Sequence, residues 1–303
     1  MFLTPADRVR EFEERGWWRG ESVDALTRRA VSQGGSSEAL VDPFNRKSLD
    51  GRDPERLTWE ALDERVDRLA SVLLSEGLRK DDIVLAQLPN TIDAVLLFLA
   101  CARLGAVLSP VAMPYRAHEL EFIVDKLAPR FFVTVAAFAG FDHAEQGRAI
   151  AATPGGPQLL LFAEGADGLY ERAASAEPAR TWGHVAANPV AGGEVLTVCW
   201  TSGTESRPKG VPRDHNHWIL NGEVVADGTG ARDGDILLNP FPLVNIGSIG
   251  GLVMPWLLLA TKLVLHHPFD LGVFLKRIEN EDVSYTIAPP AVLTALLKQP
   301  EIL

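Results

Sequence analysis

Segments typical of helices and of strands alternate between residues 58 and 111, and this alternation constrains the fold more than any other feature of the sequence. An amphipathic helix is expected over residues 58–76, an apolar strand over 83–88, a helix over 90–104 and a strand over 106–111. Strands that are joined through a helix pair in parallel, and helices then cover the sheet. The sequence therefore predicts an α/β fold built on a mostly parallel sheet.

The same alternation continues on both sides of this stretch. Further strands are expected over residues 38–41, 130–135, 158–162, 196–200, 236–239, 262–266 and 283–287, and further helices over 6–15, 22–33, 116–126, 214–227 and 270–280, with one ending at Leu259 and a last one starting at Pro290. Ser22 and Thr58 are the expected N-caps. Residues 163–193 are rich in Ala, Gly and Pro and are interpreted as a linker, which places a subdomain boundary near residue 185.

Composition bounds the possible partners. The 303 residues are 47% hydrophobic and 23% charged, enough for a large core, and the formal net charge of −11 argues against binding to nucleic acid or to an anionic membrane. Cys101 and Cys199 both lie in apolar runs, which is typical of reduced core thiols, so we expect a cytoplasmic protein. No apolar run reaches the ~18 residues of a membrane span, and the N-terminus lacks the features of a signal peptide.

A polar loop follows the expected strand over residues 196–200. Its residues of interest are Thr201, Ser202, Gly203, Thr204, Glu205, Ser206, Lys209 and Gly210. Glycines let the backbone approach a ligand, hydroxyls donate hydrogen bonds, and a lysine brings positive charge, so the loop is suited to phosphate. It is not the common nucleotide P-loop, because Lys209 precedes Gly210 instead of following it. The alternative interpretation is a surface turn without a ligand.

The order Thr-Ser-Gly-Thr over residues 201–204, followed by Arg-Pro-Lys-Gly-Val over 207–211, resembles the phosphate-binding signature of acyl- and aryl-adenylate-forming enzymes. Glu205 stands where these enzymes mostly carry a hydroxyl residue, and Ser206 where most carry glycine. We expect Glu205 to point away from the phosphates or to pair with Arg207 or Mg²⁺. The resemblance implies their large N-terminal domain, with two stacked αβα subdomains over residues 1–185 and 186–303, the second incomplete and carrying the loop.

The resemblance also implies a reaction. A carboxylate would attack the α-phosphorus of ATP with release of pyrophosphate, and the acyl group would then pass to the thiol of CoA. Lys209 would be the catalytic phosphate contact, and Thr204 would contact Mg²⁺. Loading of an acyl carrier protein and a non-catalytic binding module on the same scaffold are the alternatives, and a homodimer is possible.

The segment over residues 242–251 is expected to form the substrate end of the site. Val244 and Asn245 stand where the family usually has an aromatic residue and a histidine that flanks the carboxylate. Asparagine can donate to a carboxylate, or it can simply cap the helix that follows. Gly250 can let an acyl group lie against the backbone, or it can allow close helix packing. Residues 16–21, 212–216 and 288–292 resemble members that act on aryl or cyclic acids, so an aryl, alicyclic or medium-chain acid is expected.

Other candidates are weaker. His215 and His217 do not share a helix face, and His266 and His267 lack partners at metal-ligand spacing, so we expect solvated or hydrogen-bonded histidines. The adenine-binding block, the ribose-binding aspartate and the lysine of the C-terminal domain that the family carries have no counterpart before Leu303. We therefore expect a truncated protein that adenylates poorly by itself.

Overall fold

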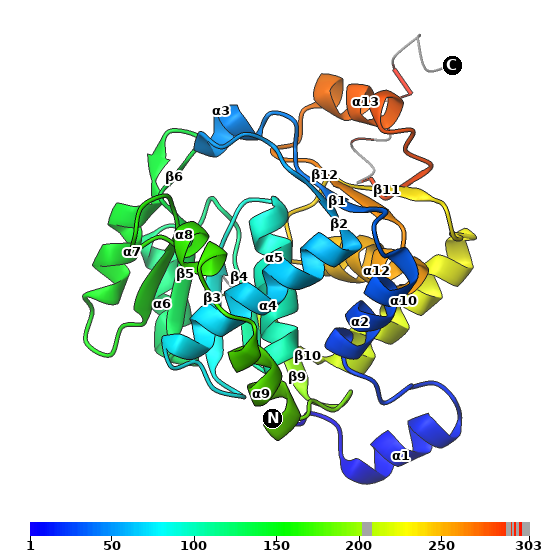
Figure 1. Cartoon of the computed structure of the whole chain (residues 1–303), viewed down its shortest axis with the longest axis horizontal. Coiled ribbons are helices and arrows are strands. Elements are labelled where there is room, and N and C mark those ends of the chain that lie inside the picture. Colours follow the sequence, from blue (N-terminus) through cyan, green and yellow to red (C-terminus); the bar gives the residue numbers. More distant parts are fainter. Residues whose placement is uncertain (202–207, 289–291, 293, 295–296, 299–303) are drawn as a thin grey trace.

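The structure is a computed structural model that describes residues 1–201, 208–288, 292, 294, 297 and 298. Two open sheets with helices packed on them form the body of the molecule (Figure 1). The expected α/β class with mostly parallel sheets is confirmed. The start of the helix expected at Pro290 lies outside the described residues.

The first sheet has six strands in the order β10-β9-β4-β3-β5-β8. Their bounds are β3 Ile83–Gln87, β4 Val107–Pro110, β5 Phe131–Val135, β8 Gln158–Phe162, β9 Val195–Thr201 and β10 Lys209–Asp214. All neighbours pair in parallel except β10, which runs antiparallel to β9. The alternation over residues 58–111 therefore produced the parallel centre of this sheet, as the sequence predicts.

The second sheet joins strands from both ends of the chain. Its order is β13-β11-β12-β1-β2, with β1 Glu38–Val41, β2 Arg56–Thr58, β11 Ile236–Asn239, β12 Lys262–Leu265 and β13 Tyr285–Thr286. Conversely, β9 and β10 belong to the first sheet. Each sheet therefore contains strands from before and from after the boundary expected near residue 185. The division into two subdomains at that residue stays a prediction.

Most of the helices pack around the two sheets, whereas α1 buries no residue and lies apart from them (Figure 1). They are α1 Ala6–Glu14, α2 Val23–Gly34, α3 Arg46–Asp50, α4 Trp59–Ser75, α5 Ile92–Leu104, α6 Ala117–Leu127, α7 His143–Ala151, α8 Leu169–Ala174, α9 Ala179–Ala187, α10 His215–Thr229, α11 Ile246–Ser248, α12 Met254–Leu259 and α13 Leu271–Asn280. A two-stranded ribbon, β6 Ala137–Phe138 with β7 Phe141–Asp142, precedes α7. Ser22 and Thr58 cap α2 and α4, because their hydroxyls accept from the amides of Ala25 and Ala61.

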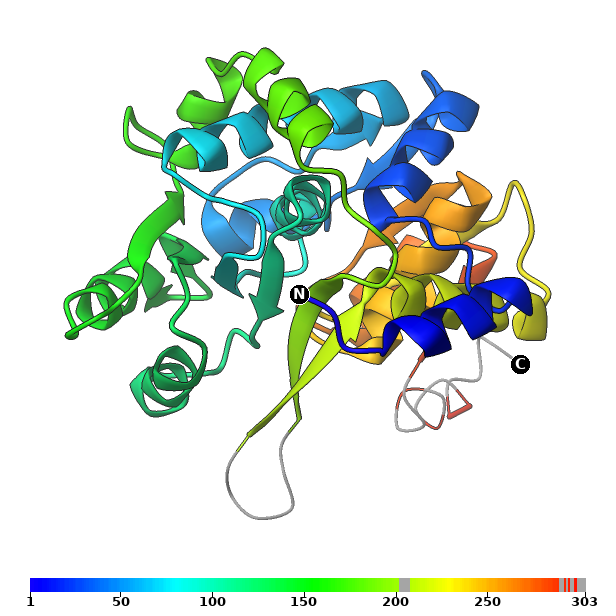
Figure 2. The same cartoon turned by 90° about the horizontal axis from the view of Figure 1, so that it is seen from below.

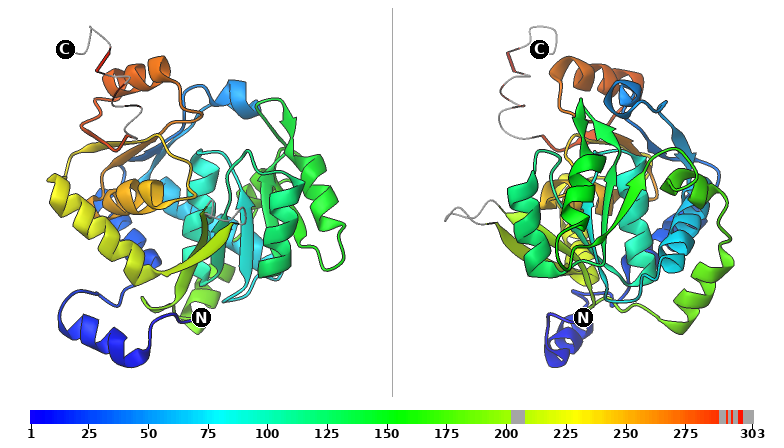
Figure 3. Two further views of the ribbon diagram at one scale, coloured as in Figure 1. Left: turned by 180° about the vertical axis from the view of Figure 1, so that it is seen from behind. Right: turned by 90° about the vertical axis from the view of Figure 1, so that its left-hand side faces the viewer.

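The interpretation of residues 163–193 as a linker is wrong over α8 and α9, which both pack on α4 (Figure 3). Leu169 is fully buried at the start of α8, and Thr181 of α9 donates its hydroxyl to the carbonyl of Asp67 at 2.8 Å. Alanine-rich sequence has a high helix propensity, and these two contacts hold the short helices against their neighbour.

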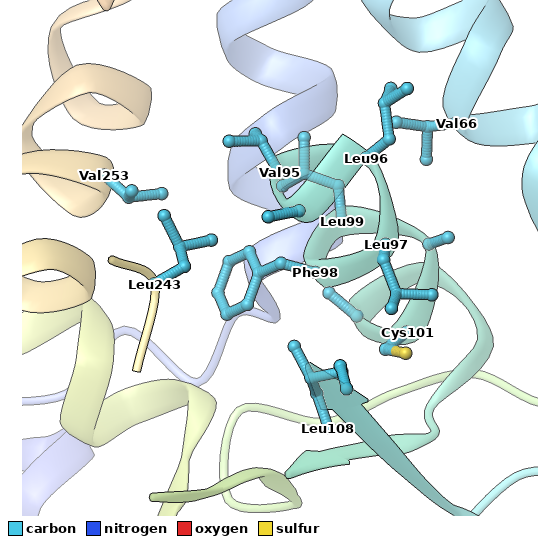
Figure 4. Close-up of a cluster of buried hydrophobic side chains, with 14 of the residues drawn as sticks. Val66, Val95, Leu96, Leu97, Phe98, Leu99, Cys101, Leu108, Leu243 and Val253 are labelled. Atoms are coloured by element: carbon cyan, nitrogen blue, oxygen red, sulfur yellow. The ribbon is translucent and has the colours of Figure 1, made fainter. Parts of the chain in front are cut away.

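The core is centred on α5, whose residues are all buried. A helix that is apolar on every side must be enclosed. Figure 4 shows its side chains packed between Val66 of α4 and Leu108 of β4. Leu243, which follows β11, and Val253, which precedes α12, complete this part of the core. Cys101 and Cys199 are free and buried, and burial raises the pKa of their thiols to about 12 and about 11. In the part of the chain that the structure describes, helices are too short or too polar to span a bilayer.

Candidate functional site

Three of the phosphate-binding candidates, Thr201, Lys209 and Gly210, lie on the antiparallel strand pair of β9 and β10, which is called the hairpin below. β9 leaves the sheet beside β4, and the chain returns antiparallel as β10, with Thr201 opposite Lys209 and Trp200 opposite Gly210. The hairpin extends on the side opposite to α4 (Figure 2). Thr201 and Lys209 are both exposed, so a hydroxyl and an ammonium group stand across from each other on the last described pair. Ser202, Gly203, Thr204, Glu205 and Ser206 lie outside the described residues.

Aromatic contacts anchor the base of the hairpin. The indole Nε1 of Trp200 donates to the Ser109 hydroxyl of β4 at 2.9 Å, and its ring meets Phe122 of α6 edge to face. A Cβ placed on Gly210 would lie 3.0 Å from Val198 and 3.4 Å from the Trp200 ring. Gly210 therefore leaves room for the indole, and a rigid base supports the polar end.

Residues 212–216 end β10 and begin α10, and they also contact α2 and the segment before it. Asp214 is buried and caps α10 by accepting from the His217 amide at 2.8 Å. The Nδ1 atom of His215 accepts from the amide of Val23 at 3.0 Å, and Asn216 accepts from Gly20 at 3.2 Å. Burial lowers the pKa of His215 to about 4, so the ring is neutral at pH 7. His215 is a hydrogen-bonded core residue, as expected.

His266 is buried and its neighbour His267 is partly buried. Burial lowers the pKa of His266 and of His267 to about 4. His266 Nε2 accepts from the amide of Asp270 at 3.2 Å, before α13. Across residues 1–201 and 208–288 the structure shows no group of three or more His, Cys, Asp and Glu side chains that could hold a metal ion.

The expected substrate segment begins where β11 ends. Asn239 accepts from the Phe241 amide at 3.1 Å and donates to the Ser248 hydroxyl at 2.9 Å, which fixes the turn between the strand and α11. Asn245 is exposed, and its Oδ1 atom accepts from the Ser248 amide at 3.1 Å. Asn245 therefore caps α11, which was one of its two interpretations, and this bond engages the oxygen of its amide rather than the NH₂ group.

A π-helix, Ile249–Val253, joins α11 to α12. Such π-helical turns are rare and are often found at functional sites. A Cβ on Gly250 would lie 1.6 Å from Asn221 Oδ1 and 3.4 Å from the Trp218 ring, both on α10. The packing interpretation of Gly250 is therefore supported, whereas its contact with substrate stays a prediction.

Val244 comes close to the first sheet. Together with Leu243 it lines a small apolar hollow whose other walls come from the carboxyl ends of β3 and β4 and from α5. Ala86, Leu108 and Pro110 are the strand residues in that wall. Ligands of open α/β sheets bind outside the carboxyl ends of the strands. The structure thus brings the expected acyl-pocket residue to the edge of the sheet from which the hairpin also extends.

Sequence reasoning missed a link between the two sheets at this edge. Asn90 follows β3, is fully buried, and donates its side-chain NH₂ group to the carbonyls of Asn239 at 3.0 Å and His266 at 3.2 Å. These two carbonyls stand at the ends of β11 and β12. An asparagine shortly after an apolar strand was the only available signal, because its partners lie 149 and 176 residues away in the sequence.

Gln87 is a second polar residue whose role was missed. Its Nε2 atom donates to the carbonyls of Ala112, Met113 and Tyr115, which shapes the segment after β4. Its Oε1 atom accepts from Gln146 at 2.9 Å and lies 3.3 Å from His143 Nδ1. Gln87 therefore holds the loops beside the hairpin in place.

Comparison with known proteins gives three findings at the level of sequence. A family model described as AMP-binding enzyme matches residues 27–303. A salicylyl-CoA synthase / salicylate adenylyltransferase from Streptomyces sp is 30% identical over 303 residues, covering 95% of this chain and 52% of that protein. A salicyl-AMP ligase / salicyl-S-ArCP synthetase from Mycobacterium tuberculosis (strain ATCC 25618 / H37Rv) is 27% identical, covering 95% of this chain and 50% of that protein.

The fold also matches solved structures. The inhibitor-bound N-terminal domain of FACL13 from Mycobacterium tuberculosis superposes with a TM-score of 0.78 at 24% identity, covering 93% of this chain and 66% of that one. At this identity the likeness shows the fold alone. The chain spans about half the length of the curated relatives it matches.

Proposed function

Because this chain belongs to the AMP-binding enzyme family, we propose that it is part of a ligase that activates a carboxylic acid with ATP. The acid forms an acyl-adenylate, and the acyl group then passes to a thiol. The observation that carries this proposal is the hairpin: a hydroxyl and a lysine face solvent across from each other at the end of β9, beside the carboxyl edge of a parallel sheet. This is the donor set that a polyphosphate requires.

Within this proposal each candidate residue has a role. Lys209 contacts the β- and γ-phosphates, and Thr201, Ser202, Gly203, Glu205, Ser206 and Gly210 form the rest of the loop. Thr204 would hold Mg²⁺, which would neutralise phosphate charge when bound. Positioning and charge neutralisation dominate this type of chemistry, so the chain's own contribution is to align the phosphates with the incoming carboxylate.

The substrate end is assigned to Val244, Asn245 and Gly250. Val244 lines the apolar hollow, and the NH₂ group of Asn245 would donate to the carboxylate of the acid. Two of the curated relatives carry salicyl in their names, which supports testing an aryl acid first. We propose an aryl, alicyclic or medium-chain acid, with an aryl acid as the first to test.

CoA is the proposed acceptor, and a carrier protein is the second candidate. One relative is named a CoA synthase, and the other is named for a product joined to ArCP, so each acceptor has support. We also propose that the protein is cytoplasmic and forms a homodimer, with subdomains over 1–185 and 186–303. Because the relatives are about twice as long as the matched region, residues 1–303 by themselves are expected to release little pyrophosphate.

The test is acid-dependent exchange of pyrophosphate into ATP, measured on residues 1–303 and on any longer protein that carries them. A panel of benzoates, salicylate, cyclohexane carboxylate and octanoate identifies the acid class. Thioester formation with CoA or with a phosphopantetheinyl carrier protein then identifies the acceptor.

A non-catalytic module is the remaining alternative. Calorimetric titration with Mg·ATP and with each acid separates it from the enzyme. Absence of exchange with every acid in the longer protein, together with retained Mg·ATP binding, would replace the ligase proposal with the binding module.

A further inference from the structure

A second cavity lies away from the hairpin. It has a volume of about 530 Å³ and opens between α4, α5 and α8, on the side of the molecule opposite to β9 and β10 (Figure 2). Ligand pockets typically have volumes of about 300–1,000 Å³. No residue assigned above to phosphate or acid binding lines it. The cavity is therefore separate from the proposed reaction site.

One side of this cavity is apolar and aromatic. Leu69, Leu96, Phe162, Leu169 and Tyr170 contribute to its wall. The rings of Phe162 and Tyr170 lie 5.5 Å apart between centroids in a tilted arrangement. Aromatic rings in such a geometry offer a surface for another ring.

Arginines supply the polar side. Arg52 and Arg65 line the cavity and share one carboxylate, since Arg52 Nη2 donates to Glu55 Oε1 at 3.1 Å and Arg65 Nη2 to the other oxygen. Glu55 thus engages one Nη2 group of each arginine, and Asp93 lies near enough to Arg52 to interact with it electrostatically. The guanidinium carbon of Arg52 lies 3.5 Å from the centroid of the Tyr170 ring, which holds the group flat against the aromatic wall.

Arg52 also has an unsatisfied donor. Its Nε atom is buried and has no hydrogen-bond partner among the residues that the structure describes. An unpartnered donor beside a cavity is available to a ligand that enters it.

The carboxylates that line the cavity are mostly engaged elsewhere. Glu64 accepts from Arg68 Nη2 at 2.9 Å, and Asp93 accepts from the Tyr170 hydroxyl at 2.8 Å and from Arg46. Glu171 is exposed to solvent. Arg46 also pairs with Asp42 and Asp50, so Asp93 adds negative charge beside Arg52. What the cavity offers an anion is therefore the hydrogen-bond donors of Arg52 and Arg65, not a net positive charge.

We propose that this cavity binds a small aromatic carboxylate, with its ring against Phe162 and Tyr170 and its carboxylate on Arg52 and Arg65. A guanidinium matches a carboxylate with two parallel hydrogen bonds. The apolar wall suits a ring and disfavours a hydrated polyanion. The site does not depend on the proposed ligase activity.

The experiment is a titration with 4-fluorobenzoate followed by ¹⁹F NMR. It is run in a Val244→Trp background, which fills the expected acyl pocket and so reports only this cavity. Arg52→Gln is expected to raise the dissociation constant by about tenfold through loss of a charge-assisted bond. Ala174→Trp changes an exposed residue at the cavity wall and is expected to block binding without removing any charge.

Arg148→Gln and Ala149→Trp are the matched controls, because both residues are exposed on α7. They should leave the dissociation constant within about twofold. Circular dichroism spectra confirm that each variant is folded, and Ala174→Trp decides the result if Arg52→Gln does not fold. Absence of saturable binding, or binding that Ala174→Trp leaves unchanged, overturns the proposal.

Discussion

The buried arginines and the hairpin lysine of this chain have opposite environments. Arg46 is almost fully buried and contacts three carboxylates: Asp42 at 2.7 Å, Asp50 at 3.2 Å, and Asp93. Arg103 is fully buried and likewise pairs with Asp24, Asp63 and Asp67. Lys209 is exposed, and it has no carboxylate partner within residues 1–201 and 208–288.

The contrast distinguishes charged side chains that stabilise the fold, such as Arg46 and Arg103, from a charged side chain that is available to a ligand, such as Lys209. A buried ion needs complete pairing, because desolvation costs several kcal/mol per ion. Burial raises the pKa of Asp93 even though Arg46 opposes the shift, which shows how much the pairing must offset. An exposed lysine has no such requirement and can pair with an incoming phosphate. Substitutions at the two kinds of site should therefore affect different measurements.

The largest effect is expected at Arg46. Arg46→Ala leaves Asp42 and Asp93 buried without their cation, and breaking such a group lowers the free energy of unfolding by about 3–5 kcal/mol. Urea unfolding followed by circular dichroism measures this change. Lys47→Gln, which removes the neighbouring exposed pair with Asp53, is the control and should leave the unfolding midpoint unchanged. An equal loss in both variants would remove the contrast between buried and exposed charge.

Lys209→Gln should show the reverse pattern. The rate of acid-dependent pyrophosphate exchange is expected to fall about 10²–10³-fold, as on removal of a donor to developing charge. The free energy of unfolding should change by less than about 0.5 kcal/mol, because Lys209 is exposed. Lys276→Gln on α13 is the exposed control for the rate. A stability loss at Lys209 that accounts for the rate loss would assign the residue to the fold instead of to the site.

Local sequence patterns predicted the centre of the first sheet but not the strand pairing of the second sheet, for a physical reason. The alternation over residues 58–111 involves neighbouring elements, so its pattern determines α4, β3, α5 and β4. The pairing of β1 with β12 joins Leu40 to Leu263, and no local pattern records a contact of that sequence separation. The helices α8 and α9 were missed because they are short and lie in a stretch rich in Ala, Gly and Pro, which is also typical of linkers.

The site divides in the same way. The hairpin motif indicated Thr201 and Lys209 as a set, since hydroxyls, glycines and lysine are adjacent in sequence. The sequence did not reveal that the chain after the loop continues as β10, although Pro212 is compatible with an edge strand. The link from Asn90 to β11 and β12 depends entirely on the tertiary fold.

The pH dependence of stability gives a smaller test of the same contrast. The folded-state pKa of His215 is lowered by burial to about 4, although Asp214, Glu194 and Asp24 oppose the shift and Lys80 adds to it. The unfolded chain therefore binds a proton that the folded chain excludes. Stability is fully present above about pH 6.5 and falls toward pH 4, by on the order of 1 kcal/mol per pH unit for one such histidine.

Burial also lowers the pKa values of His143, His266 and His267 to about 4, so these residues contribute to the loss of stability over the same pH range. Unfolding free energies measured in urea from pH 7 to pH 4.5 give the slope. His215→Gln keeps an acceptor for the Val23 amide and should reduce the slope, whereas His118→Gln on the exposed face of α6 should not. An unchanged slope in His215→Gln would mean that the buried ring does not control this loss.

The smallest effects are expected at Asn245, where the fold and the site use the same side chain. Asn245→Ala removes the cap of α11 and should lower the free energy of unfolding by about 1 kcal/mol. Asn245→Asp keeps an oxygen for the Ser248 amide, so its stability should match the parent, but it replaces the NH₂ donor with a negative charge.

A role in acid binding therefore predicts that Asn245→Asp raises the KM for the carboxylic acid while the unfolding midpoint stays constant. Asn245→Ser, which retains a capping hydroxyl without added charge, is the control for the repulsion itself. If Asn245→Asp keeps both the parental KM and the parental midpoint, Asn245 belongs with Arg46 and Arg103 among the polar residues that serve the fold, and Val244 remains as the assigned contact to the acid on this segment.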